Sequence, residues 1–186
     1  MVENMSVVLF VCTGNLCRSP SAELLLEREL VAHGTNGVAV HSAGTRGASF
    51  GPPERLVKEA AAFDIDLEGH VPQVIDQAMV GEADLLIGMT REHVREVVLI
   101  QTSAFSRSFT LREIVRRGQE VGPRPPHEEL ASWLGRLHAG RQHIDLVGDA
   151  AIDDIADPMG GNADDYRAML HDVSALSALL RQLAWP

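Results

Sequence analysis

The apolar positions of the chain fall into short continuous runs that alternate with segments of helical spacing. Runs at residues 7–11, 38–41 and 83–88 are apolar almost throughout, and residues 107–111 form a fourth, less apolar candidate. Strands of a parallel sheet show such runs because helices cover both of their faces, whereas half-exposed strands alternate between apolar and polar residues. The pattern therefore predicts buried parallel strands.

Helical spacing follows these runs. The first helix is expected to run to residue 32, with Ser19 or Ser21 as its N-cap and Glu23 facing solvent. Its buried face would consist of Ala22, Leu25, Leu26, Leu30 and His33. Further helices are expected at residues 54–63, 112–117 and 127–138, after a cap at Thr90, and after a cap at Asn162.

Strands that alternate with helices predict an α/β fold in which helices cover both faces of a parallel sheet. Ligands bind such sheets beyond the carboxyl ends of the strands, so the loops after residues 11 and 41 should open at one edge. The 186 residues suffice for a buried core, and a single domain spanning residues 1–186 is expected. Residues 118–149, which open on several prolines, are the least regular part.

Composition narrows the class of protein. Hydrophobic residues make up 45% of the chain and charged residues 23%, and the net charge of −10 argues against a nucleic-acid-binding surface. No apolar run approaches the ~18 residues that span a bilayer, and the N-terminus lacks a signal-peptide pattern, so no membrane partner is expected. Two cysteines are too few for a disulfide scaffold, which makes a reducing cytoplasm the expected compartment.

Residues 7–23 contain the main chemical candidate. The first predicted strand ends at Cys12, Arg18 follows after five intervening residues, and a helix begins there. A loop between a buried strand and a helix N-terminus gathers N–H groups that bind anions. Cys12 would lie at the floor of this loop, and the planar guanidinium of Arg18 matches phosphate oxygens. The alternative is a small buried cysteine before an ordinary helix start. A nucleotide P-loop is excluded because no Gly-Lys-Ser/Thr follows.

The sequence CTGNLCRS at residues 12–19 resembles the phosphate-binding loop of the low-molecular-weight protein tyrosine phosphatases of bacterial type. SAGT at 42–45, ADLLIGMTREH at 83–93 and DPMGG at 157–161 follow in the order of that family, and Tyr166 fits its last helix. The resemblance implies the phosphotyrosine phosphatase I-like fold, which has three layers and a four-stranded parallel sheet with helices on both faces. It leaves residues 118–149 as an insertion.

The resemblance also implies roles for the loop residues. Cys12 would attack phosphorus to form a phosphocysteine, Arg18 would bind the equatorial oxygens, and Asp157 would act as general acid and then as base. Ser19 would hydrogen-bond the sulfur. The backbone N–H groups that hold the phosphate would be those of Thr13, Gly14, Asn15, Leu16, Cys17 and Arg18. For Asp157 the alternative is a simple turn, which Asp-Pro favours.

Asn15 is expected to have a positive φ, which asparagine tolerates. By resemblance, Ser42 and His70 would hydrogen-bond to it, although an ordinary strand-end serine and a loop histidine are the alternatives. Cys17 matches a second loop cysteine that in some family members traps oxidised Cys12 as a disulfide, and an inert packing thiol is its alternative. The remaining histidines lack the spacing of metal ligands, so no metal is expected.

Two aromatic positions of the family's substrate cleft are changed in this chain. Ala48 stands at the first position and Met159 at the second, and Phe50 and Trp133 are candidates to replace the missing aromatic walls. Related arginine phosphatases carry threonine at the position of Leu16, so this apolar residue favours phosphotyrosine. Related arsenate reductases need two further cysteines, which this chain lacks.

The expected function is that of a protein-tyrosine-phosphatase, a phosphoric monoester hydrolase without cofactor or metal. Its substrate would be a phosphorylated protein, inorganic phosphate its product and inhibitor, and a monomer its oligomeric state. Two alternatives stay open: a phosphate-binding or adaptor module with weak catalysis, and a phosphatase of another group such as phosphoarginine. The insertion is either a tolerated surface segment or a lid or docking element near Asp157.

Overall fold

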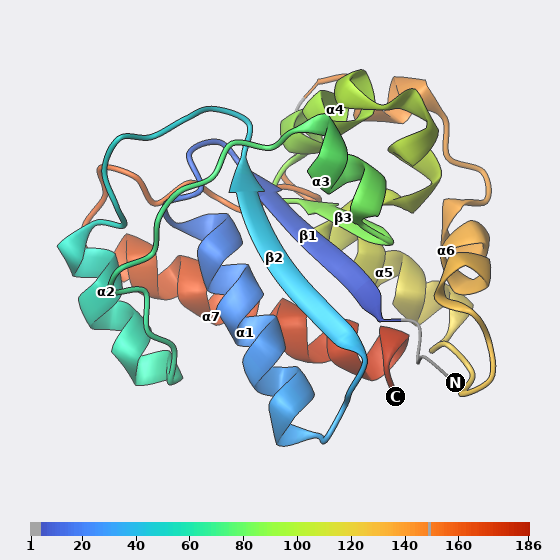
Figure 1. The fold of residues 1–186 in the computed structure, drawn as a ribbon, viewed down its shortest axis with the longest axis horizontal. Helices are drawn as coiled ribbons and strands as arrows, with labels where there is room; N and C mark the ends of the chain where they lie inside the picture. Colours follow the sequence, from blue (N-terminus) through green and yellow to red (C-terminus); the bar gives the residue numbers. More distant parts are fainter. Residues whose placement is uncertain (1–4, 149) are drawn as a thin grey trace.

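A computed structural model describes residues 5–148 and 150–186 and confirms the α/β fold with its three layers (Figure 1). All strand pairs are parallel, and the strand order is β2-β1-β3-β4. The strands are β1 (Ser6–Cys12), β2 (Val38–Gly44), β3 (Leu85–Gly88) and β4 (Ser108–Thr110). The less apolar run at residues 107–111 therefore does contain the fourth strand.

Helices cover both faces of this sheet. On one face lie α1 (Arg18–Ala32), α2 (Glu54–Ala60), α5 (Leu111–Val121) and α7 (Ala163–Ala184). On the other lie α3 (Gln77–Glu82) and α4 (Arg91–Ile100). The helix α6 (Leu130–His138) lies beside α5, and three short 3-10 helices are η1 (Ala61–Phe63), η2 (Thr102–Arg107) and η3 (His143–Leu146).

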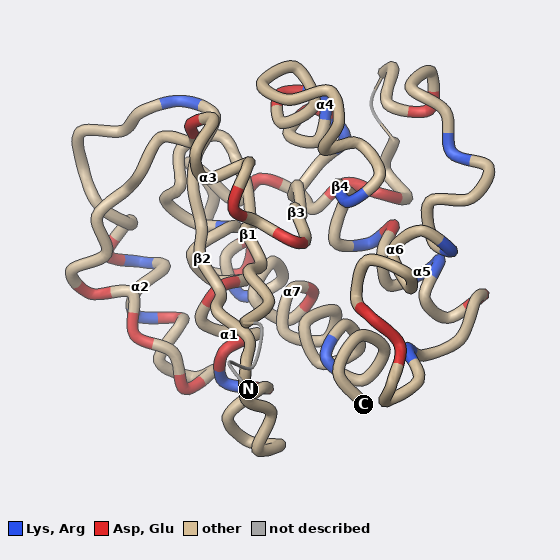
Figure 2. Tube along the Cα trace, turned by 45° about the vertical axis from the view of Figure 1, so that its right-hand side comes forward, with Lys and Arg blue, Asp and Glu red and all other residues tan. Residues whose placement is uncertain are grey.

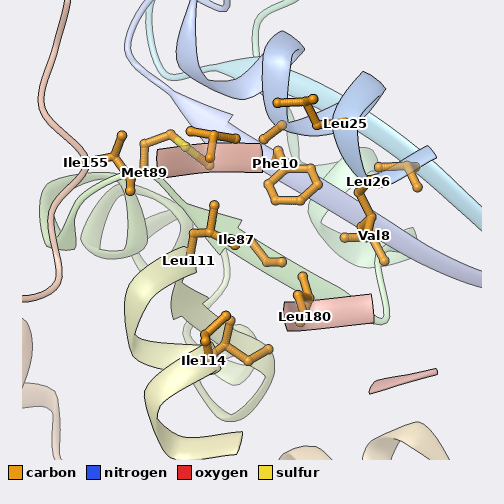
Figure 3. Packing of buried hydrophobic residues seen from close by; sticks show 14 of the residues in the cluster. Val8, Phe10, Leu25, Leu26, Ile87, Met89, Leu111, Ile114, Ile155 and Leu180 are labelled. Carbon is orange, nitrogen blue, oxygen red and sulfur yellow. The ribbon is translucent and has the colours of Figure 1, made fainter. Parts of the chain in front are cut away.

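Alternate side chains of β1 enter two separate cores. Phe10 packs in the larger cluster with Leu25 and Leu26 of α1, which lie beside it in Figure 3. Leu9 and Val11 face the opposite way, into the cluster that includes residues of α3 and α4. Because both faces are buried, β1 reads as continuously apolar, which is the pattern from which it was predicted.

Two details of the first helix differ from the prediction. Neither Ser19 nor Ser21 is its N-cap, because the cap position is occupied by Cys17 and has no side-chain hydrogen bond. Ser19 instead lies in the first turn, where its hydroxyl has another partner, described below. His33 is exposed at the C-cap and does not extend the buried face. The caps predicted at Thr90 and Asn162 are confirmed.

The segment 118–149 contains the expected helix as α6, and this helix is built into the core. Trp133 is 0% exposed, and its Nε1–H donates to the Gly122 carbonyl over 3.0 Å. Leu134 and Leu137 are buried beside it. Trp133 therefore cannot form a wall of a substrate cleft, and that part of the prediction is wrong.

Trp133→Ala is expected to lower the free energy of unfolding by about 3–5 kcal/mol, because it opens a large cavity in the core. Urea denaturation followed by circular dichroism measures this loss. Val31→Ala on α1, where the side chain is 79% exposed, is the control and should change stability by less than about 0.5 kcal/mol. A similar small change for Trp133→Ala would show that α6 contributes little to the core.

Acidic and basic positions are interspersed along the trace in Figure 2. The net charge of −10 leaves no general positive field to attract an anion. No helix among the described residues has the length and apolar character needed to cross a membrane. An anionic ligand must therefore be held by local groups, as at the end of β1.

Candidate active site

The loop between β1 and α1 is fixed by the residues that follow β2. Thr45 N–H donates to the Cys12 carbonyl and Arg46 N–H to the Thr13 carbonyl, each over 2.9 Å. A Cβ atom on Gly44 would lie 2.7 Å from the Thr13 carbonyl oxygen, so only glycine allows this approach. The loops after the first two strands thus meet at one edge of the sheet, as predicted.

The loop itself has the form of an anion cradle. Asn15 has the expected positive φ, at 52°. Within the described residues, no backbone N–H from Thr13 to Cys17 donates to another protein group. These donors lie at the N-terminus of the 15-residue helix α1, where the helix dipole adds positive potential. The loop can therefore hold an oxyanion with N–H groups that have no other use.

Cys12 is 2% exposed, and its Sγ lies 3.0 Å from the Ser19 hydroxyl. Asn15 Nδ2 donates to Ser19 Oγ over 3.0 Å and to Ser42 Oγ over 2.8 Å. Because the Ser19 oxygen accepts from Asn15, its own proton is free for the sulfur or for the Ala43 carbonyl, 3.3 Å away. The hydrogen bond from Ser19 to the candidate nucleophile is therefore available in the folded chain.

Asn15 is held by the two residues that the resemblance implied and by the backbone of Gln73, whose N–H donates to Asn15 Oδ1 over 2.9 Å. Ser42 contacts its side chain, and His70 Nε2 lies 2.9 Å from its carbonyl oxygen. The Ser42 hydroxyl in turn donates to Glu23 Oε2. The expectation that Glu23 only faces solvent is wrong, since it orients Ser42.

Arg18 and Asp157 meet at the rim of the same loop. Arg18 is 5% exposed, and its Nη2 lies 2.6 Å from Asp157 Oδ2. Asp157 is in the loop before α7, and its side chain is 46% exposed. Cys12, Arg18 and Asp157, predicted as a catalytic set, thus lie at one edge of the sheet.

The loop that contains Asp157 is anchored by a buried carboxylate that sequence reasoning missed. Asp153 is 2% exposed and accepts from Arg91 Nη2 over 2.6 Å and from Arg116 Nη2 over 2.9 Å. Ile155 N–H donates to the Met89 carbonyl over 2.8 Å, and Figure 3 shows the two side chains together. Burial alone would raise the pKa of Asp153, but Arg116 and Arg91 together outweigh it and hold that pKa below its ordinary value.

Asp153→Asn is expected to lower the free energy of unfolding at neutral pH by about 3 kcal/mol, because it leaves two arginines without their counter-charge. The depressed pKa means that this stabilisation is complete above the unfolded-state value of about 3.9 and is lost as pH falls through the lower folded-state value. Urea unfolding of both proteins at several pH values should show their stabilities converging in acid. Asp164→Asn, at a side chain that is 84% exposed, is the control. A difference that stays constant into acid would contradict the prediction.

Cys17 is buried and unpaired, as is Cys12. Burial raises the pKa of the Cys17 thiol to about 12, and the negative charges of Cys12 and Asp157 add to this effect while Arg18 opposes it. Its Sγ donates to Met159 Sδ over 3.4 Å. Cys17 is therefore a protonated thiol in the reduced protein, and its role as a redox partner stays a prediction.

The rim residues are only partly accessible. Phe50 is 59% exposed and Met159 is 45% exposed, whereas Ala48 packs against the core. Leu16 is buried at 6% exposure. Phe50 and Met159 are thus the accessible members of the cleft predicted from the sequence. Among the residues that the structure describes, no group of three or more His, Cys, Asp or Glu side chains could hold a metal ion.

Comparison with known proteins connects this site to one family. The family model for low molecular weight phosphotyrosine protein phosphatases matches residues 7–122. The protein-tyrosine-phosphatase Etp of Escherichia coli K12 is 38% identical over 94 residues, which are 50% of this chain and 60% of that relative. A protein-arginine-phosphatase of Bacillus subtilis is 29% identical over 178 residues, 95% of this chain and 93% of the relative.

Comparison with solved structures agrees with the family match. The low molecular weight protein tyrosine phosphatase of T. tengcongensis superposes with a TM-score of 0.70 at 25% identity, covering 94% of this chain and 97% of that structure. The family model alone covers more than half of the 186 residues and includes the whole anion loop. The chain therefore belongs to the low molecular weight phosphotyrosine protein phosphatase family.

Proposed function

We propose that the protein is a metal-independent phosphatase that hydrolyses phosphorylated protein side chains through a phosphocysteine. The observation that carries this proposal is the 2.6 Å pair of Arg18 and Asp157 at the rim of the loop whose floor is Cys12. A phosphoryl group held by the loop N–H groups would lie between the sulfur and the carboxyl group. One site thus offers a nucleophile, a cation and a proton donor.

The reaction would proceed in two displacements. The Cys12 thiolate attacks phosphorus and the bond from phosphorus to the leaving oxygen breaks, while Asp157 gives that oxygen a proton. Asp157, now a carboxylate, then takes a proton from water, whose oxygen attacks the phosphocysteine and releases inorganic phosphate and the thiolate. Arg18 and the loop N–H groups stabilise the charge on the equatorial oxygens in both steps. Ser19 favours departure of the sulfur by donating a hydrogen bond to it.

We propose phosphotyrosine as the substrate group, with phosphoarginine as the second candidate. Leu16 in the loop supports phosphotyrosine, as does the name of the Etp relative. The relative named as an arginine phosphatase supports the alternative, because its similarity extends over 95% of this chain. Because Ala48 and Met159 replace the aromatic residues of the cleft, no stacking at these two positions favours a phenol ring over another leaving group.

A peptide panel tests both the reaction and the substrate. One peptide sequence is prepared with phosphotyrosine, phosphoserine or phosphoarginine, and phosphate release is measured with and without a metal chelator. We expect kcat/KM to be highest for phosphotyrosine and unchanged by the chelator. Preference for phosphoarginine would favour the second candidate. Phosphate binding without turnover of any peptide would indicate the adaptor module.

We propose that residues 1–186 form one phosphatase domain in which residues 118–149 are a structural insertion. The burial of α6 supports this, and so does the end of the family match at residue 122. If this segment were a lid, replacing its exposed residues would change turnover without changing stability. We further propose a monomer in a reducing cytoplasm, since one chain supplies the whole site and both cysteines are unpaired.

A further inference from the structure

His93 lies behind the anion loop and has no role in the mechanism above. It is the third residue of α4 and is 2% exposed. Its Nε2 lies 3.0 Å from the hydroxyl oxygen of Thr13, the residue after Cys12. A buried polar ring that contacts the loop next to the nucleophile is a candidate for fixing the loop's geometry.

The hydrogen bonds around this ring determine its tautomer. Thr90 N–H donates to His93 Nδ1 over 3.1 Å, and the Thr90 hydroxyl oxygen lies 2.8 Å from the same nitrogen. A hydroxyl can donate or accept, but a backbone N–H can only donate, so we assign Nδ1 a lone pair and no proton. In the uncharged ring the proton is then on Nε2, which donates it to Thr13. Burial, together with the charge of Arg18, lowers the pKa of His93 to about 3, so the ring is uncharged at neutral pH.

The Thr13 hydroxyl oxygen accepts from two directions. His93 Nε2 donates to it over 3.0 Å and Arg18 Nη2 over 3.4 Å. A hydroxyl oxygen has two lone pairs, so both are used and the single hydroxyl proton must be donated elsewhere. Within the described part of the chain this proton has no protein acceptor.

We propose that His93 is a positioning residue for phosphate binding, which fixes the Thr13 hydroxyl so that its proton is directed at an anion held in the loop. His93 touches no reacting atom and acts through Thr13. The same oxygen also limits where the guanidinium of Arg18 can lie. The proposal rests on the proposed function in one respect, namely that the anion is the phosphoryl group of the substrate.

Two substitutions of His93 separate its two hydrogen bonds. In His93→Gln the amide reaches as far as Nε2 and can still donate to Thr13. In His93→Asn the shorter side chain can accept from Thr90 but cannot reach Thr13. We expect His93→Asn to weaken binding of inorganic phosphate about tenfold, the scale of one lost hydrogen bond, and His93→Gln to stay close to the wild type.

A double-mutant cycle with Thr13→Val tests whether the effect passes through Thr13. Isothermal titration with inorganic phosphate measures each variant, and the double variant should bind no more weakly than Thr13→Val alone. Thr110→Ala is the stability control, since Thr110 is also buried and caps α5 by accepting from Glu113 N–H over 3.1 Å. It should lower Tm without weakening phosphate binding.

Three results would overturn the role of His93. They are additive losses in the cycle, equal losses for His93→Asn and His93→Gln, and loss of phosphate affinity in Thr110→Ala equal to that in His93→Asn. The cycle measures binding alone, so it gives an answer even if the wild type hydrolyses no phosphopeptide. Absence of phosphopeptide hydrolysis by the wild type would reject the proposed function and leave the role of His93 in anion binding intact.

Discussion

Cys12→Ser will reduce hydrolysis of p-nitrophenyl phosphate to background, a loss on the order of 10⁴-fold or more, the scale found when a catalytic nucleophile is removed. A serine hydroxyl is not ionised at neutral pH, and in the proposed mechanism Asp157 serves the leaving group and not the nucleophile. The loop N–H groups and Arg18 remain in place. Inorganic phosphate should therefore bind to the variant within about threefold of its affinity for the wild type.

Two measurements are needed to interpret this result. Steady-state kinetics gives turnover, and isothermal titration gives the affinity for phosphate. Ser177→Ala is the control, because Ser177 is a fully buried residue of α7 outside the loop. Residual turnover above about one part in a hundred would contradict a phosphocysteine mechanism. Loss of phosphate binding together with turnover would indicate a damaged loop and would not identify the nucleophile.

The parts of the fold that could be predicted from the sequence are those that depend on residues close together along the chain. The runs at residues 7–11, 38–41 and 83–88 each lie within or overlap an observed strand. The cap at Asn162 was also predictable, since its side chain accepts from Asp164 N–H and Asp165 N–H in the first turn of α7. The six-residue helix α3 was missed because it is too short for a helical period to be visible.

The first turn of α1 shows where a local rule gave the wrong result. Serine before an apolar periodic segment ordinarily caps a helix, because its oxygen satisfies an N–H of the first turn. Here those N–H groups face the anion loop, and a capping side chain would occupy the place of the ligand. The hydroxyl of Ser19 bonds to Cys12 instead. Functional loops are where local preferences are expected to fail.

The supporting residues of the site depend on contacts between distant segments. Asp153 meets Arg91 and Arg116 across 62 and 37 residues, and His93 meets Thr13 across 80. Several aspartates precede Asp157 in the sequence, and nothing local marks Asp153 as the buried one. The ADLLIGMTREH segment at 83–93 did include both Arg91 and His93, so resemblance marked the region without showing the roles of these two residues.

Asp157→Asn will lower kcat/KM by about 10²–10³-fold for phenyl phosphate and phosphotyrosine peptides, whose leaving oxygens need a proton as the bond to phosphorus breaks. For aryl phosphates with strongly electron-withdrawing substituents, the leaving group departs as an anion and the loss should be much smaller. Because kcat/KM reports the steps up to the first irreversible one, it isolates transfer to Cys12 from the later attack of water. A series of substituted phenyl phosphates therefore gives a steeper dependence on leaving-group basicity in the variant.

The ion pair of Asp157 with Arg18 offers a second explanation for the loss of kcat/KM in Asp157→Asn, and the same series tests it. Asparagine at position 157 also removes a charge that lies 2.6 Å from the guanidinium, and a misplaced Arg18 would weaken every substrate alike. An equal loss across the leaving-group series would thus assign Asp157 to orienting Arg18 and reject it as the general acid. Asp164→Asn, which removes a charge seven positions further along the chain, should leave the whole series unchanged. A steeper series in Asp157→Asn than in the wild type would identify the proton donor, since loss of proton transfer makes the effect of the substitution grow with leaving-group basicity.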